Sequence, residues 1–349
     1  MNAIELANVT KVYRRYARRK QFATLKSALL TGSLIQDLRP EEKFPALQDV
    51  SFVVPAGTTT ALVGETGSGK TMTALSLLRL LPQGARGEAK TLRLGDVDIA
   101  ALSEADMGHI RGSRISMIFQ DPLAALNPVR TVGFQIVEPL RAHRRMKAGD
   151  TKKRAAALLA QVGIPDPAYN AKRYPHELSG GMRQRVLIAA ALACDPEILL
   201  ADEPTTALDV TIQAQILRLI RAETERRGLA VLLVTHDLAV ASTIADRIQV
   251  MYGGTIVERG KTRDVLREPN HPYTKGLLDS VPTVRRKLTP LRAIPGSPEG
   301  VAAIRQGCRF APRCAYAIDR CVALEPPLVE VAPDHESRCW VFAPPKGGT

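Results

Sequence analysis

Apolar and polar positions follow two kinds of pattern along this chain. Short, nearly continuous apolar or β-branched runs at 58–63, 198–201 and 230–234 are typical of parallel strands buried on both faces. Further strands are expected at 4–9, 46–54 and 115–119. Longer segments of helical periodicity are found at 72–81, 133–146, 151–162, about 180–193 and 209–226. Strands that alternate with helices predict an α/β fold.

The pattern is interrupted near the start of the chain and changes near residue 260. Residues 11–36 carry seven basic residues and no acidic one. This indicates a basic insertion at about 14–44, either solvated or forming a surface helix that touches lipid or a partner. After about residue 260 proline becomes frequent and the long periodic patterns fade. We therefore expect one domain at 1–260 and a small, irregular C-terminal extension at 261–349.

The charge balance raises the question of partners. Lys and Arg number 48 against 35 Asp and Glu, a net charge of +13, with one basic cluster at 141–154. Such an excess fits nucleic acid, anionic lipid or a phosphate-bearing ligand. The longest uninterrupted apolar run, 186–194, is far shorter than the roughly 20 residues that cross a bilayer. The first residues lack the apolar stretch of a signal peptide, so we expect an intracellular protein.

A glycine-rich turn follows the strand expected at 58–63. Residues 64–71 read GETGSGKT and match G-x-x-x-x-G-K-[ST] directly before a predicted helix. In this motif backbone N–H groups surround the phosphates of a nucleotide, Lys70 meets the β- and γ-phosphates, and the Thr71 hydroxyl binds Mg²⁺. The residues expected to contact ATP are Gly64, Glu65, Thr66, Gly67, Ser68, Gly69, Lys70, Thr71 and Met72.

Polar side chains that suit phosphate chemistry follow three further strands. Asp202 and Glu203 end one apolar run, where Asp202 would hold the Mg²⁺ and Glu203 would activate the attacking water as a general base. His236 follows another run and is placed to bond the γ-phosphate and Glu203. Gln120 follows a third strand, and its amide can reach Mg²⁺ or the attacking water. Together with Lys70 they form the expected catalytic set.

A second anion-binding helix start lies roughly a hundred residues after the first. Residues 178–185 read LSGGMRQR, and Ser179, Gly180 and Gly181 open a predicted helix. Kinases and GTPases have no need of a second such terminus. One chain with two phosphate-binding helix starts suggests two half-sites.

These motifs together resemble the ATP-binding cassette (ABC) family. The elements that carry the resemblance, which spans residues 1–260, are the phosphate loop, Gln120, the LSGGM signature, Asp202-Glu203, the turn Ala207-Leu208-Asp209 and His236. The resemblance implies a P-loop NTPase fold with a RecA-like core, an antiparallel β subdomain and a helical signature subdomain at about 121–190.

The resemblance also adds nucleotide contacts. It implies that two cassettes pair head to tail, so that Ser179, Gly180 and Gly181 contact ATP held by the partner's phosphate loop, and it adds Asp209 to the nucleotide site. Tyr13 stands where the family places an aromatic residue that stacks on adenine, and Tyr16 is the competing candidate.

Further motifs look like those of the dipeptide/oligopeptide importers, a subfamily that also includes nickel importers. They are FQDPL at 119–123, LNP at 126–128, NHPYT at 270–274, IPGSP at 294–298 and GCRFAPRC at 307–314. The resemblance implies a peripheral ATPase, a peptide translocase, on the cytoplasmic face of the inner cell membrane. It would act with a second, related but non-identical ATPase subunit, two transmembrane permease subunits and, indirectly, an extracytoplasmic substrate-binding protein.

Two alternatives stay open at this point. The solute could be nickel or another small molecule in place of a peptide, because an ATPase sequence does not carry the selection. The other is a soluble ABC ATPase that acts on nucleic acid or ribosomes, but the chain has one phosphate loop and no heptad run. We therefore expect no nucleic-acid partner.

Four cysteines lie together in the C-terminal extension: Cys308, Cys314, Cys321 and Cys339. Their spacing matches neither paired zinc knuckles nor the common bacterial ferredoxin run. Neighbouring arginines would favour thiolates; these are Arg309, Arg313 and Arg320. Four thiolates suit a tetrahedral Zn²⁺ or a [4Fe–4S] cluster, and the absence of any metal is the third possibility. Members of the subfamily carry such a cluster in this extension, so the resemblance implies a structural [4Fe–4S] cluster.

Overall fold

The computed structural model describes residues 2–15, 42–81, 86–144, 148–281, 293–297, 301, 304 and 306–344. The basic insertion expected at 14–44, with Tyr16 in it, falls almost entirely outside this described part.

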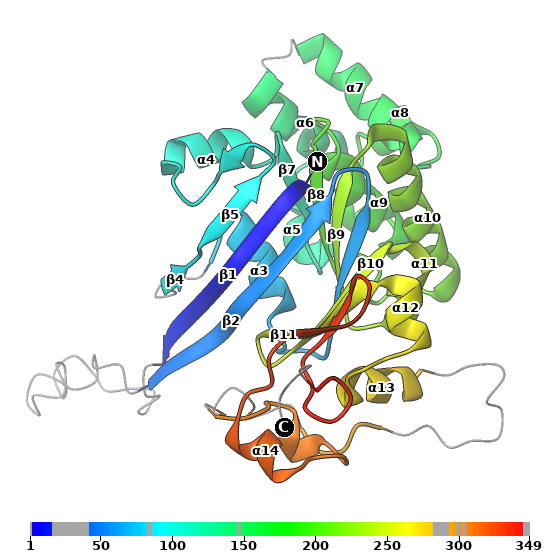
Figure 1. Cartoon of the computed structure of the whole chain (residues 1–349). Helices are drawn as coiled ribbons and strands as arrows, with labels where there is room; N and C mark the ends of the chain where they lie inside the picture. Colours follow the sequence, from blue (N-terminus) through cyan, green and yellow to red (C-terminus); the bar gives the residue numbers. More distant parts are fainter. Residues whose placement is uncertain are drawn as a thin grey trace, which may run out of the picture.

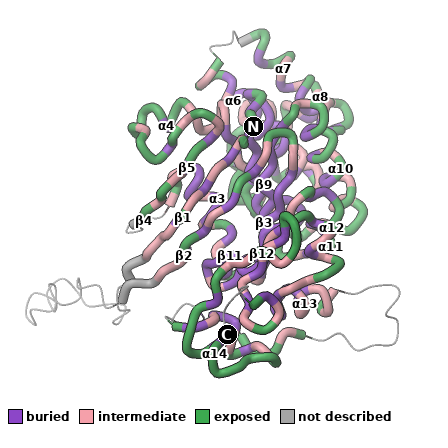
Figure 2. The backbone as a smooth tube through the Cα atoms, viewed as in Figure 1, coloured by how far each residue is buried: buried purple, intermediate pink, exposed green. Residues whose placement is uncertain are grey.

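Five neighbouring parallel strands form the centre of the molecule (Figure 1). In spatial order they are β10 (Arg247–Tyr252), β3 (Thr59–Val63), β9 (Ala230–Thr235), β8 (Ile198–Asp202) and β7 (Ile115–Ile118). Every residue of β3, β8 and β9 is buried, as expected for strands covered on both faces (Figure 2). The predicted α/β core is confirmed. The strand β10 was not predicted.

Helices cover both faces of this sheet. They include α3 (Lys70–Leu77), α9 (Gly180–Ala191), α10 (Val210–Arg227) and α11 (Leu238–Ile244). Because side chains alternate along a strand, neighbouring residues of β3 enter different cores. Ala61 and Val63 pack in the cluster that contains α9, α10 and α11, whereas Leu62 packs with Leu77 of α3. The sheet therefore separates two hydrophobic cores.

A second, antiparallel sheet packs over the α3 side. Its strands are β1 (Asn2–Arg15), β2 (Glu42–Pro55), β4 (Arg86–Glu88), β5 (Thr91–Leu94) and β6 (Val97–Asp98). Leu6 and Phe52 from this sheet share the core of α3. The implied antiparallel β subdomain is present, followed by the short helix α4 (Glu104–Ile110). β1 and β2 are longer than predicted, because their polar ends pair with each other without an apolar pattern.

A group of helices forms the signature subdomain. Before α9 it contains α5 (Pro122–Ala125), α6 (Val132–Arg144), α7 (Ala148–Gln161), α8 (Pro167–Asn170) and the 3₁₀ turn η1 (Pro175–Glu177). Of these elements, α6, α7 and α8 lie together at the top of Figure 1. The helical subdomain implied by the resemblance is therefore confirmed.

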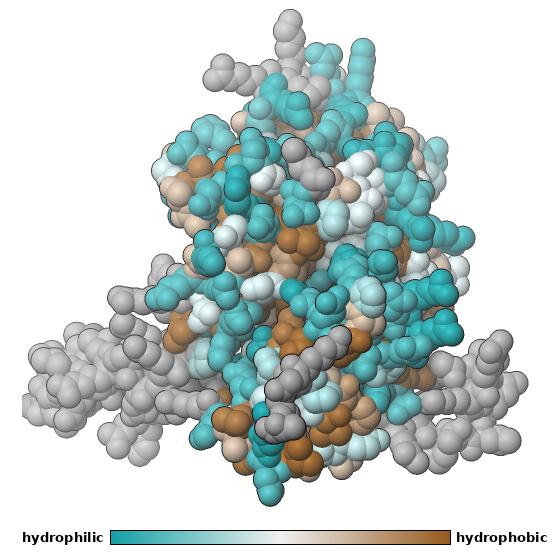
Figure 3. Space-filling model, viewed as in Figure 1, coloured by the Kyte–Doolittle hydropathy of each residue, from teal (hydrophilic) through white to brown (hydrophobic). Residues whose placement is uncertain are grey.

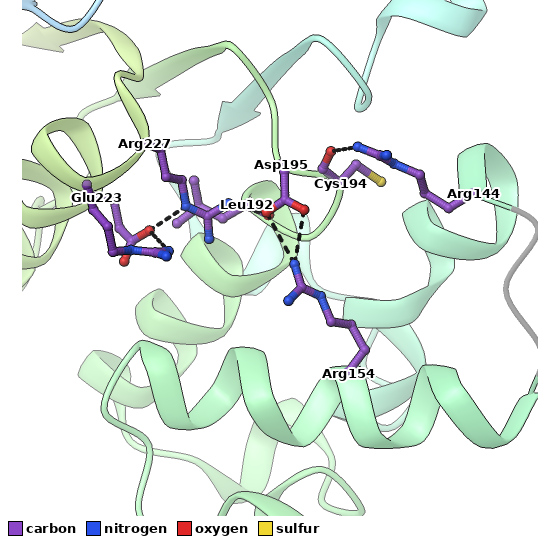
Figure 4. A network of polar contacts seen from close by, with 8 residues as sticks. Arg144, Arg154, Leu192, Cys194, Asp195, Glu223 and Arg227 are labelled. Atoms are coloured by element: carbon purple, nitrogen blue, oxygen red, sulfur yellow. Dashed lines mark hydrogen bonds and ion pairs between the residues drawn. The ribbon is translucent and has the colours of Figure 1, made fainter.

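An ion-pair network joins this subdomain to the core (Figure 4). Arg154 of α7 and Arg227 of α10 both bind the carboxylate of Asp195, which follows α9. Arg227 also binds Glu223 at 2.6 Å, and Arg144 of α6 donates to the Cys194 carbonyl at 2.6 Å. Arg144 and Arg154 belong to the basic cluster at 141–154. Part of the positive charge of this cluster is therefore engaged in contacts within the chain.

The C-terminal extension completes the central sheet. After β11 (Thr255–Lys261) come α12 (Thr262–Arg267), α13 (Pro272–Asp279), the 3₁₀ turn η4 (Ala311–Arg313), α14 (Asp319–Ala323), β12 (Val329–Ala332) and β13 (His335–Ser337). β11 pairs with β10 on one edge and with β13 on the other, which gives the full order β12-β13-β11-β10-β3-β9-β8-β7. Both sides of the boundary expected near 260 therefore share one sheet.

A buried carboxylate anchors the extension to the core. Glu258 of β11 is fully buried and lies 2.8 Å from Nε2 of His335 on β13. The same carboxylate accepts the backbone N–H groups of Asn270 and His271, at the start of α13. One side chain thus fixes β13 and α13 together.

The surface of the extension carries apolar side chains. Tyr316, Ile318, Val322 and Leu324 are each about half exposed or more, and Figure 3 shows apolar surface at the bottom of the molecule, where the extension lies. Among the described residues, no helix is long and apolar enough to cross a membrane.

Candidate nucleotide site

The glycine-rich turn joins the end of β3 to the start of α3. Gly69 precedes the helix with φ 104°, a conformation that favours glycine, and a Cβ there would come within 2.8 Å of the Leu47 side chain. Lys70 is 5% exposed and its Nζ donates to the carbonyls of Gly64 at 2.6 Å and Glu65 at 2.9 Å. Burial lowers the pKa of Lys70, although three nearby carboxylates oppose that shift. The Lys70 ammonium group therefore lies inside the loop, bonded to two of its carbonyls.

The ends of neighbouring elements bring a hydroxyl and a carboxylate together beside this loop. Thr71 Oγ1, in the first turn of α3, donates to Oδ1 of Asp202 at the end of β8, at 3.2 Å. Asp202 is 3% exposed, and burial raises its pKa. An oxygen pair of this kind suits Mg²⁺. The predicted meeting of Thr71 and Asp202 is present in the structure.

Glu203 is the centre of a second polar group. Its Oε2 accepts from Gln120 Nε2 and from Thr206 Oγ1, each at 2.9 Å, and its Oε1 lies 3.0 Å from His236 Nδ1. The structure therefore brings together Gln120, Glu203 and His236, as the sequence predicted. Thr206 was not predicted as a site residue, although it follows Glu203 by three residues and so lies within reach of that carboxylate.

The surroundings of Glu203 favour its ionised form. Burial raises the pKa of this carboxyl, but hydrogen bonds from His236 and Thr206, together with nearby positive charge such as that of Lys70, hold the pKa below its usual range. The backbone of Glu203 has φ 46°, an uncommon conformation for a non-glycine residue, and its N–H donates to the Val234 carbonyl of β9 at 2.9 Å. Glu203 is thus held as a carboxylate at the edge of the sheet.

The signature turn opens α9 and packs on the start of α10. Ser179 is exposed and its side chain accepts from the Met182 N–H as the helix cap. A Cβ on Gly181 would come within 2.8 Å of Ile212, and Ile212 in turn donates its N–H to the capping carboxylate of Asp209. Gly181 therefore lies against the start of α10, which Asp209 caps. Both α9 and α10 are separate from α3, the helix that follows the phosphate loop.

Tyr13 lies in β1, where its backbone pairs with Phe44. Its side chain lies outside the described residues, so the expected adenine contact stays a prediction.

Known proteins are similar to this chain. Residues 47–206 match the family described as ABC transporter, and residues 257–321 match the family described as oligopeptide/dipeptide transporter, C-terminal region. The oligopeptide transport ATP-binding protein AppD of Bacillus subtilis is 46% identical over 305 residues, covering 87% of this chain and 93% of its own. The chain belongs to the ABC transporter ATPase family.

Other relatives agree with this ABC ATPase in sequence and in fold. The dipeptide transport ATP-binding protein DppD of Escherichia coli is 44% identical, with 85% of this chain and 90% of that protein covered. The dimeric structure of MJ0796, described as a bacterial ABC transporter cassette, superposes with a TM-score of 0.60 at 30% identity, over 74% of this chain and 99% of that one. A second structure of that cassette, with the same scores, holds ADP and phosphate. This chain is therefore an ATPase with the ABC fold.

The phosphate loop of this ABC ATPase has contacts that the sequence did not reveal. The Glu65 N–H donates to Tyr273 Oη of α13 at 2.7 Å. The Glu65 carboxylate accepts both ends of the Arg313 guanidinium, at 2.7 and 3.1 Å. Both partners come from beyond residue 260, more than two hundred residues along the chain. Tyr273 and Arg313 stood within motifs of the resemblance, which is the signal that could have pointed to them.

The four cysteines of the extension line one small cavity, together with His271, Phe310 and Trp340. All four are free thiols. Burial raises the pKa of Cys308 to about 11 and also raises the pKa of Cys314. Within the described part of the chain, no group of three or more His, Cys, Asp or Glu side chains is arranged to hold a metal ion. The thiols therefore converge, but their placement is not that of a ligand set.

The prediction that the neighbouring arginines favour thiolates is wrong. Arg309 binds the Gly253 carbonyl and Gln48, and Arg313 binds Glu65. Arg320 lies over the Trp340 ring, 3.9 Å from its centre. Each guanidinium contacts other groups, and burial raises the pKa of Cys308 and Cys314 instead of lowering it.

Proposed function

We propose that the chain is the ATPase subunit that powers import of di- or oligopeptides from the cytoplasmic face of the inner cell membrane. The observation that carries the proposal is the combination of a hydrolytic carboxylate group at Glu203 with an extension that matches the oligopeptide/dipeptide transporter region. The printed functions of AppD and DppD, oligopeptide and dipeptide transport, support this solute class. Nickel or another small solute is the alternative.

The site residues divide the chemistry of hydrolysis among them. Water forms a bond to the γ-phosphorus of ATP while the bond to the β-phosphate oxygen breaks, and ADP and phosphate leave. Glu203, held ionised, accepts the proton of that water, and Gln120 and His236 orient the water and the γ-phosphate. Lys70 exchanges the loop carbonyls for the β- and γ-phosphates, which develop negative charge.

Magnesium fits the donors that the site offers. Thr71, Asp202 and Gln120 would hold the ion by oxygen atoms, and Asp202 and Thr71 already lie within hydrogen-bond distance. The bound ion supplies charge neutralisation between the phosphates.

A complete nucleotide site takes two chains. Ser179 is exposed at the start of α9, where free backbone N–H groups favour an anion, so Ser179, Gly180 and Gly181 contact ATP held by a partner ATPase subunit. Asp209 is exposed and caps α10, whose Ile212 lies against Gly181. The dimeric form of MJ0796 supports such pairing. The partner in this proposal is a related, non-identical subunit.

The helical subdomain offers a surface for the permease. Leu123 of α5 is 60% exposed and Val129 is 75% exposed, both in the stretch that follows Gln120. Exposed apolar side chains of this kind mark interaction sites. Closure of two cassettes moves this surface, which couples hydrolysis to two permease subunits and, through them, to an extracytoplasmic binding protein.

For the four cysteines we propose a structural [4Fe–4S] cluster, with Zn²⁺ as the alternative. The support is that all four line one cavity and are soft ligands, and a cluster would have to draw the sulfurs closer together, because no three of them form a ligand set among the described residues. Anaerobic purification with metal analysis tests it: about four irons per chain supports the cluster, about one zinc supports the alternative, and neither metal contradicts both.

Transport itself is tested by reconstitution. The chain, its partner ATPase and the permease are placed in vesicles with the binding protein outside, and ATP-dependent uptake of labelled di- and oligopeptides is measured against uptake of nickel. The Glu203→Gln variant serves as the control without hydrolysis. Peptide uptake that needs both ATP and Glu203 supports the proposal. Uptake of nickel alone, or salt-sensitive nucleic-acid binding without membrane association, overturns it.

A further inference from the structure

The phosphate loop contains a carboxylate whose charge opposes its ligand. Glu65 is the second residue of the GETGSGKT turn, and the ligand of this turn is a polyphosphate. An unpaired carboxylate beside phosphates costs binding free energy through like-charge repulsion. The loop therefore needs a cation at this point in addition to Lys70.

Arg313 of the C-terminal extension supplies that cation. Its guanidinium forms a two-pronged ion pair with Glu65, and its side chain is 5% exposed against 27% for Glu65. A bidentate pair of this kind orients both side chains and also neutralises the charge of the carboxylate. The pair joins residues that are 248 positions apart.

Arg313 is itself held in place on several sides. Its Nε donates to the Pro295 carbonyl at 2.8 Å, and its Nη1 lies 3.3 Å from Tyr252 Oη. The guanidinium also lies about 6 Å from the centres of the Tyr252 and Phe310 rings. A guanidinium with this many contacts has lost most of its rotational freedom, so it holds Glu65 instead of following it.

The backbone of Glu65 has a second anchor from the same extension. Its N–H donates to Tyr273 Oη, and Tyr273 is fully buried on α13. The carbonyl of Glu65 accepts from Lys70 Nζ. The position of Glu65 therefore sets one of the two carbonyls that Lys70 contacts inside the loop.

We propose that Arg313 and Tyr273 are positioning residues of the nucleotide site, through which the C-terminal extension sets the affinity of the phosphate loop for ATP. Arg313 cancels the charge of Glu65, and the two residues together hold the loop in the shape that receives phosphates. The extension is thus a part of the ATP site as well as a region of the fold. This inference rests on ATP binding by the phosphate loop and goes beyond the proposed peptide import.

The test is a set of binding titrations with a fluorescent ATP analogue and Mg²⁺ on the full-length chain, at a temperature well below unfolding. We expect Arg313→Gln to weaken binding about tenfold, because Glu65 is left unpaired beside the phosphates, and Arg313→Lys to weaken it less. The double variant Glu65→Gln/Arg313→Gln should recover to within about threefold of the wild type, since it removes the uncompensated charge. The affinity of Arg313→Gln should also fall less steeply with added salt than that of the wild type, because salt screens the repulsion between Glu65 and the phosphates.

Controls separate this inference from a general structural effect. Arg320→Gln removes an arginine of the same extension that stacks on Trp340, and its affinity should equal that of the wild type. Tyr273→Phe should weaken binding without altering the salt dependence, because it removes only the acceptor for the Glu65 N–H. The turnover number at saturating ATP should stay within about twofold in the Arg313 variants, since the reacting groups are untouched.

Two outcomes overturn the inference and leave the nucleotide site intact. One is an Arg313→Gln variant with wild-type affinity while Lys70→Ala abolishes binding. The other is equal weakening in Arg313→Gln and in the double variant, which would mean that the loss comes from local unfolding. If the wild-type chain itself fails to bind the analogue, ATP binding by the phosphate loop fails with it.

Discussion

His236 Nδ1 lies 3.0 Å from Oε1 of Glu203, so the imidazole and the carboxylate at the ends of β9 and β8 form one unit. Their contact explains how a partly buried carboxylate stays ionised. Substitutions of Glu203 and of His236 should therefore have effects on turnover that can be told apart.

Replacement of Glu203 by Gln removes the group that accepts the proton of water. The shape is kept, so ATP binding should remain near the wild-type level while turnover falls by about 100-fold or more. Cassette pairs should then accumulate in the ATP-bound, closed form, which size-exclusion chromatography with ATP can detect. Wild-type turnover by this variant, paired with an equally substituted or inactive partner, would remove Glu203 from the role of base.

Replacement of His236 by Ala should change the pH dependence of turnover as well as its size. Loss of the hydrogen bond to Glu203 raises the pKa of that carboxyl toward its usual range. Since the base works only when ionised, the acidic limb of the rate profile should move to higher pH. Turnover measured between about pH 4 and 8 reports this limb. A profile that only scales down, with its acidic limb unmoved, would contradict the coupling.

Substitution of Asp195 by Asn should loosen the helical subdomain. Asp195 has φ 50°, which Asn tolerates, so the change removes charge and keeps the turn. It removes the ion pairs with Arg154 and Arg227, of which Arg227 is well buried, and the melting temperature should fall by about 2–4 °C. Glu225→Gln, which breaks the exposed pair with Arg221, is the matched control and should leave melting unchanged.

Replacement of Glu258 by Ala should have a larger effect on stability. It leaves two backbone N–H groups and the His335 ring without their buried acceptor, at a cost of about 2–4 kcal/mol in the free energy of unfolding. Thermal or urea denaturation measures the loss. Glu330→Gln, an exposed carboxylate on β12, should be neutral, and equal stability of both variants would argue against the anchoring role of Glu258.

Much of the candidate site could be predicted because its signals are local. The phosphate loop, the signature turn and the acidic pair after β8 are each recognisable within eight residues. Their convergence followed from one topological fact, that parallel strands end at the same edge of a sheet. This reasoning correctly placed Asp202 near Thr71, and Gln120 and His236 near Glu203.

The rest depended on contacts between distant parts of the chain. No local sequence pattern indicates that Arg313 pairs with Glu65. The sequence suggested instead that Arg313 acts on the neighbouring cysteines. β12 and β13 have only four and three residues, which is too short for periodicity to distinguish them from a loop. Their place at the sheet edge is decided by the buried Glu258, which is visible only once the sheet is formed.

The pairing of β13 with β11 has a consequence for the order in which the molecule is made. During synthesis, β11 leaves the ribosome with one unpaired edge, and such an edge is prone to wrong pairing until its partner arrives. Arg313 and β13 follow β11 only after more than fifty further residues have been translated. A nascent chain can therefore build most of both hydrophobic cores before it receives the strand that pairs with β11 and the guanidinium beside Glu65.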